Sequence, residues 1–139
     1  MTGETDLPRL LMAMSPMLDD TEWVFAVVTE SKLEECLPQA IASFREQEGV
    51  TLVLPTDSIG VSKGLFEHVS APMARITLQV HSSLHAVGLT AAVANALAER
   101  GISTNVVAAY FHDHIFVPVS ARFRALDCLN ALASSHDLG

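Results

Sequence analysis

The chain has 139 residues, of which 50% are hydrophobic, so it can build one domain of ordinary size or two small units that share a core. The 16 acidic residues outnumber the 8 basic ones, and the net charge of −8 with no Lys/Arg cluster argues against a nucleic-acid partner. No apolar run is long enough to span a membrane and no signal peptide is recognisable, so we expect a cytoplasmic protein.

A short helix and a strand are predicted at the start of the chain. The helix has an apolar stripe at helical spacing, formed by Leu7, Leu10, Leu11 and Met14, and Pro16 ends it. Residues 23–28 are apolar at every position, which is the pattern of a strand buried on both faces.

The segment 31–74 predicts a helical turn, a hairpin and a crossing segment. Ser31 begins the helical turn, in which Leu33 and Leu37 are expected to face inward. Two strands, 44–48 and 50–54, are joined by a turn at Glu48 and Gly49. After a turn or single helical loop at 59–64, residues 65–74 are expected to form a crossing segment or an edge strand.

The second half predicts a strand, a crossover helix and a hairpin. Polar and apolar residues alternate over 75–81, as in a strand with one buried face. A helix follows, with Leu89, Val93, Ala96 and Leu97 on one face and Gly101 as its left-handed stop. Strands 105–111 and 115–119 then flank a turn, and the third strand is expected to lie between the other two.

A final helix is predicted over 120–135, with Ser120 as its cap. Its apolar stripe is Phe123, Leu126, Cys128 or Leu129, and Leu132.

The order of elements in the first half repeats in the second half. Trp23 corresponds to Ile76, an offset of 53 (76 − 23), and Pro55 corresponds to Pro118, an offset of 63 (118 − 55). The difference between the offsets falls in the crossover helix, which is longer in the second half. We therefore predict two tandem α+β units, 1–72 and 73–139, that join because neither buries much surface alone.

Residues 75–105 resemble the ACT domain, a small regulatory module. The matching features are the strand, a loop ending in Gly88-Leu89, a helix ending in Ala98-Glu99-Arg100-Gly101-Ile102, and Asn105 opening the next strand. The segments 3–7, 14–16 and 48–55 resemble a narrower group, namely small uncharacterised bacterial proteins built of two ACT-like units.

The resemblance implies a ferredoxin-like fold, βαββαβ, with an antiparallel sheet in each unit. It also implies units that pair side by side, a homodimer, and a non-catalytic regulatory protein that binds an amino acid between the first-strand loop and a neighbouring unit. The usual ACT loop has an Asp and a Pro before the glycine, whereas this chain has neither between Ser83 and Val87.

The candidate ligand-binding residues are those of this loop and the start of the next strand: Ser82, Ser83, Leu84, His85, Ala86, Val87, Gly88 and Asn105. A helix start offers free N–H groups to a carboxylate, and Gly88 lets a ligand or another backbone approach closely. The alternative is structural: Ser83 caps the helix, Gly88 packs against the sheet, and Asn105 satisfies a turn.

A second hypothesis is a metal-dependent enzyme centred on His112, Asp113 and His114, which His81 and His85 would approach from the neighbouring strand. Against it, Asp113 more naturally makes the hairpin turn. A third hypothesis is a purely structural interaction module. Because the sequence has no Gly-x-Ser-x-Gly elbow and no P-loop, we favour a non-enzyme and expect no cofactor.

Overall fold

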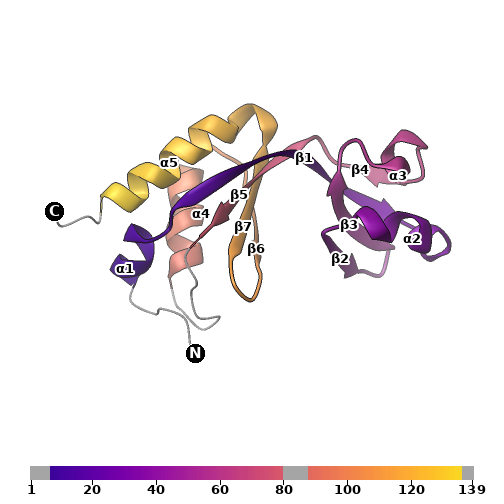
Figure 1. The fold of residues 1–139 in the computed structure, drawn as a ribbon, viewed down its shortest axis with the longest axis horizontal. Helices are drawn as coiled ribbons and strands as arrows, with labels where there is room; N and C mark the ends of the chain where they lie inside the picture. The colour runs from indigo at the N-terminus through magenta and orange to yellow at the C-terminus, as the bar shows by residue number, and fades with distance from the viewer. Residues whose placement is uncertain (1–6, 80–87, 136–139) are drawn as a thin grey trace. The chain divides into compact units, whose positions relative to one another are not determined.

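The computed structural model describes residues 7–79 and 88–135, which form two compact units (Figure 1). Unit 1 contains the described residues of 1–20 and 74–139, and unit 2 contains residues 21–73. Strand β1 (Pro16–Val28) therefore contributes residues 16–20 to unit 1 and residues 21–28 to unit 2.

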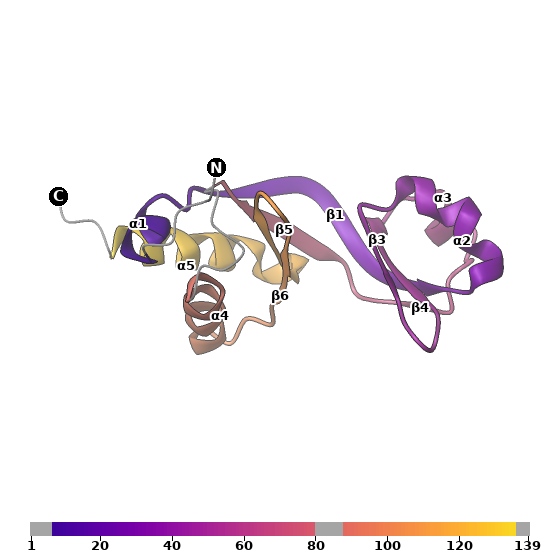
Figure 2. The same cartoon turned by 90° about the horizontal axis from the view of Figure 1, so that it is seen from below.

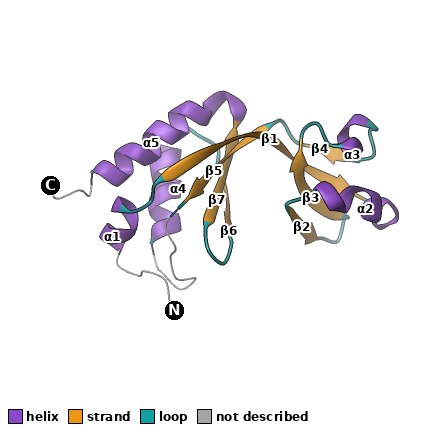
Figure 3. Ribbon diagram, viewed as in Figure 1, coloured by secondary structure: helices purple, strands orange, loops and turns teal. Residues whose placement is uncertain are grey.

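Unit 2 has the element order βαββαβ. After β1 come α2 (Glu30–Cys36), the 3-10 turn η1 (Leu37–Gln39), β2 (Ala42–Arg45), β3 (Val50–Pro55), α3 (Ile59–Ser62) and β4 (His68–Val69). The strands lie in the order β4-β1-β3-β2, and each pair is antiparallel. This is the ferredoxin-like arrangement that the sequence predicted (Figure 3).

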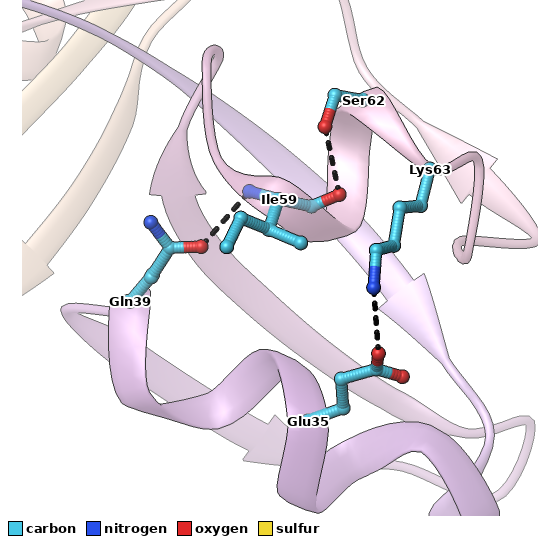
Figure 4. Close-up of polar contacts among 5 residues, drawn as sticks. All are labelled: Glu35, Gln39, Ile59, Ser62 and Lys63. Carbon is cyan, nitrogen blue, oxygen red and sulfur yellow. Dashed lines mark hydrogen bonds and ion pairs between the residues drawn. The ribbon is translucent and has the colours of Figure 1, made fainter.

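The core of unit 2 lies between its sheet and its helices. It contains Val24, Val28, Cys36, Val50, Leu52 and Leu54. Polar contacts hold the short helices together (Figure 4): the Ile59 N–H donates to Gln39 Oε1 over 2.9 Å, and Lys63 Nζ lies 3.3 Å from Glu35 Oε1. The Glu46 N–H donates to the Gly49 carbonyl over 2.8 Å, so the predicted turn closes the hairpin.

Unit 1 begins with α1 (Leu7–Met12) and residues 16–20 of β1, and continues after unit 2 with the remaining elements. These are β5 (Met73–Leu78), α4 (Leu89–Glu99), β6 (Asn105–Ala108), β7 (Asp113–Pro118), the 3-10 turn η2 (Val119–Ala121) and α5 (Arg122–Ser134). The strand order is β1-β5-β7-β6, so the prediction that the third strand lies between the other two is confirmed.

The edge strand beside β5 comes from the start of the chain. The Gln79 N–H donates to the Met14 carbonyl over 2.9 Å, and Arg75 donates to Asp19 through Nε and Nη2. Higher residue numbers in β5 therefore pair with lower residue numbers near β1, so β1 and β5 run antiparallel. Unit 1 thus completes its own βαββαβ set with an N-terminal strand in the place of the last one.

Helices α1, α4 and α5 lie on one face of the unit 1 sheet (Figures 1 and 2). The residues of this core with 0% exposure are Leu10, Met14, Ile76, Leu97, Ile115, Val117, Ala125 and Leu129. At the end of α4, Gly101 has φ +70° and the Ile102 N–H donates to the Leu97 carbonyl, as expected for a left-handed stop.

Several local predictions were wrong. Leu37 is 44% exposed because it belongs to the 3-10 turn around Pro38, and Phe123 is 63% exposed. Ser120 does not cap α5, since η2 precedes the helix and Ala121 holds the N-cap position. The strand predicted at 105–111 stops at Ala108.

The compact units also differ from the predicted ranges 1–72 and 73–139 at the N-terminus. Residues 7–20 group with the second half of the chain because Leu10, Leu11 and Met14 are buried in the core of unit 1.

Candidate functional site

One edge of the unit 1 sheet gathers the ends of several elements. Strand β5 ends there, β6 and β7 are joined there by their hairpin turn, and α4 starts there before running back across the sheet. The Ala109 N–H donates to the His112 carbonyl over 3.0 Å and closes the turn. The start of α4 and the predicted His-Asp-His turn therefore belong to the same edge, because parallel strands β5 and β6 end on one side of a sheet.

Gly88 shapes the start of α4. Its φ is +102°, and its carbonyl accepts the first helical hydrogen bond, from the Ala92 N–H over 2.8 Å. A Cβ at this position would lie 3.1 Å from Cδ2 of Leu7, so α1 packs directly against the glycine. The neighbour of Gly88 in this structure is thus a side chain of the same unit, and the predicted approach of a ligand or another backbone stays a prediction.

The α4 start leaves backbone donors without helical acceptors. The N–H groups of Leu89, Thr90 and Ala91 point out of the first turn, as in any α-helix, and Gly88 has no side chain to accept from them. Thr90 and Ala91 are exposed. The positive end of the helix dipole adds to the attraction of this position for a small anion.

The remaining predicted loop residues lie outside the described residues: Ser82, Ser83, Leu84, His85, Ala86 and Val87. Asn105 is exposed and pairs with Phe116 at the first position of β6. It lies roughly 10 Å along β6 from the hairpin turn, so unit 1 by itself does not bring Asn105 to the α4 start. Its role in ligand binding remains a prediction.

The histidine turn divides between the two faces of the sheet. Asp113 alternates with Ile115 and Val117, which are buried in the core under the helices. His114 points to the other face, where its Nδ1 lies 3.0 Å from Thr77 Oγ1 of β5. The structure therefore does not bring Asp113 and His114 together as joint ligands, because successive strand residues point to opposite faces.

Burial shapes the protonation of this turn. Burial raises the pKa of Asp113, and the nearby His112 opposes that rise. Burial also lowers the pKa of His114, with further lowering by the positive charges of Arg75 and His112. Both side chains are therefore biased toward their neutral forms.

Within residues 7–79 and 88–135, no three His, Cys, Asp or Glu side chains are grouped as metal ligands. The two described cysteines, Cys36 and Cys128, are buried free thiols. None of the described helices has the length and apolar character needed to cross a bilayer.

Sequence reasoning missed two features of this edge. One is the packing of Leu7 against Gly88, which joins residues 81 positions apart (88 − 7) and leaves no local signal. The other is the burial of Asp113. The sequence does contain a signal for it, because Asp113 alternates with Ile115 and Val117 and the three residues share one face of the strand.

Two family models match the chain, and both describe the ACT domain. One matches residues 2–59 and the other residues 72–131. No curated protein matches the sequence.

Solved structures share the fold. A Vibrio cholerae protein of unknown function, described as a possible transport protein, is 45% identical; the match covers 91% of this chain and 95% of that one with a TM-score of 0.77. The regulatory subunit of aspartate kinase from Thermus thermophilus is 11% identical over 86% of this chain and 98% of its own, with a TM-score of 0.64. In Clostridium acetobutylicum aspartate kinase the match covers 34% of that longer chain, at 11% identity and a TM-score of 0.66.

Proposed function

The chain belongs to the ACT domain family, and on that premise we propose that it is a non-catalytic regulatory protein that binds a free amino acid at the start of α4. Two ACT domains in tandem support a regulatory role, because domains of this family typically bind small regulatory ligands. Two structural neighbours are an aspartate kinase and the regulatory subunit of an aspartate kinase, and a regulatory role for this chain is of the same kind.

The observation that carries the proposal is the helix start at Gly88. Its donors, on Leu89, Thr90 and Ala91, have no acceptor within the helix, and two of these residues are exposed. A carboxylate is the group that such donors and the helix dipole favour. Every free amino acid carries one.

We also propose that the protein is cytoplasmic and forms a homodimer. Among the described strands, β2 pairs only with β3 and β6 only with β7, so each has one edge available for a second copy. Phe44 on β2 is 72% exposed. Light scattering after size exclusion should give twice the chain mass of 14.9 kDa, and a mass of one chain at micromolar concentration would refute the dimer.

Thermal-shift measurements with each of the twenty amino acids test the binding proposal. A ligand at 100 times its dissociation constant stabilises the folded state by about 2.7 kcal/mol, which shifts the melting temperature by several degrees. We expect a saturable shift with one amino acid or a few related ones. Matched amino-acid amides, which lack the carboxylate, should give a smaller shift.

A protein that melts at one temperature with all twenty ligands at 10 mM, and shows no heat of binding by calorimetry, would refute the binding proposal. Equal shifts by the amino acids and their amides would instead show that the helix start does not receive a carboxylate.

A further inference from the structure

Asp113 is a largely buried acidic side chain, and no described residue pairs with its carboxyl group. It is 9% exposed, and apart from Ser58 it is the only polar or charged residue in the buried set of the described chain. No hydrogen bond or ion pair to its carboxyl group is present within the described residues, where the one charged group found to influence it is His112. A carboxylate removed from water needs a cation or several donors to compensate for the lost hydration.

The position of Asp113 follows from the register of β7. The Thr77–His114 hydrogen bond aligns His114 with Thr77, and since β5 and β7 are neighbours, Asp113 falls beside Leu78. Leu78 and Leu89, the first residue of α4, belong to the same core cluster. Asp113 therefore lies at the end of β5, on the face that carries α4, at the edge where that helix begins.

A second unused polar group lies on the same turn. Nδ1 of His112 is buried and has no hydrogen-bond partner within the described part of the chain. Asp113 offers carboxyl oxygens as acceptors. An ammonium group carries three N–H donors and a positive charge, so it matches a carboxylate in charge and in hydrogen-bonding capacity.

We propose that Asp113 receives the ammonium group of the bound amino acid while the start of α4 receives its carboxylate. This inference rests on the proposed function, and it adds the reason why the site would select an amino acid over other small carboxylates. The ligand would supply a cation beside Asp113, for which the described residues provide no ion-pair partner. The raised pKa of Asp113 is consistent with this, because a carboxyl group that burial removes from water resists ionisation until a cation binds beside it.

The test compares two ligands on the intact wild-type protein. One is the amino acid that gives the largest shift in the screen, and the other is the 2-hydroxy acid with the same side chain, in which a hydroxyl group replaces the ammonium group. Calorimetry at pH 7.5 should show the amino acid binding at least about tenfold more tightly, as expected when a buried charged group is left without its partner. Equal affinities would overturn the inference without any variant.

The variant Asp113→Asn keeps the shape of the side chain and removes its charge. We expect it to lower the affinity for the amino acid about tenfold or more and to leave the affinity for the 2-hydroxy acid within about twofold. Asp127→Asn, an exposed carboxyl on α5 of the same unit, is the matched control and should behave like the wild type.

The outcomes separate the two proposals. If the wild type binds the amino acid and Asp113→Asn binds it equally well, the role of Asp113 is refuted and the proposed function stands. If the wild type binds no amino acid at all, the proposed function is refuted and the role of Asp113 falls with it. Circular dichroism of the Asn variant, expected to match the wild type, distinguishes lost binding from lost folding.

Discussion

Replacing Gly88 tests the geometry on which the binding site depends. The residue has φ +102°, and a Cβ there would lie 3.1 Å from Leu7 Cδ2, which is closer than ordinary van der Waals contact. Gly88→Ala therefore introduces backbone strain and crowding together. Gly101→Ala is a matched control, because Gly101 has φ +70° and no atom within 4 Å of an added Cβ.

The expected losses of unfolding free energy follow from the backbone strain and the crowding. A non-glycine residue in the left-handed region costs about 1–2 kcal/mol, and Gly101→Ala should cost about 1 kcal/mol because its φ lies near the centre of that region. Gly88→Ala should cost about 2 kcal/mol, since its φ lies further out and Leu7 must move. For a unit of this size, that difference is roughly 4–8 °C in melting temperature.

Circular dichroism and tryptophan fluorescence report the unfolding of the two units separately. The longest helices, α4 and α5, lie in unit 1, whereas the single tryptophan, Trp23, lies in unit 2. The helical signal of Gly88→Ala should therefore melt earlier than that of the wild type. Adding Leu7→Ala should recover part of the loss, because it removes the atom that the new Cβ meets. If Gly88→Ala melts like the wild type or above Gly101→Ala, the described helix start is wrong.

Three further changes test other parts of the structure. Gly60→Ala should destabilise unit 2 by about 1–3 kcal/mol in urea, since the new Cβ would lie 2.7 Å from the Phe66 ring; an unchanged midpoint by tryptophan fluorescence would contradict that packing. Leu10→Ala should cost about 2–5 kcal/mol by circular dichroism, whereas Met12→Ala, 41% exposed, should cost under about 1 kcal/mol; equal effects would refute the burial of α1 in unit 1. Because the pKa of Asp113 is raised in the folded state, wild-type stability should fall as the pH rises from about 3.9 through the folded value, and Asp113→Asn should remove that loss; parallel stability curves from pH 3 to 7 would exclude a raised pKa.

The sequence predicted best the elements whose signals are local. The alternation in β5 and the helical face of α4, ended by Gly101, correspond to the structure because a single buried face sets each pattern. The interlocking strand order followed from the hairpin and the crossover helix.

No local pattern indicates that β1 begins at Pro16. Residues 19–22 are polar and three of them are acidic, so they lack the pattern of a strand, and their pairing depends on β5 more than fifty residues later. Asp19 shows how such a residue is accommodated: it accepts two hydrogen bonds from Arg75. The ligand site was harder to predict than the strands. Most of the predicted loop residues lie outside the described range, and the burial of Asp113 depends on the packing of the whole sheet.

The split of unit 1 between the two ends of the chain bears on how the protein folds during synthesis. Unit 2 is continuous, so all its residues have left the ribosome while β7 and α5 are still being made. Until then α1 and the first residues of β1 have no partner, and Leu10, Leu11 and Met14 remain in water. We expect nascent chains stopped just before β7 begins at Asp113 to hold a folded unit 2 behind an unfolded N-terminal segment, and to depend on chaperones for as long as that apolar segment is uncovered.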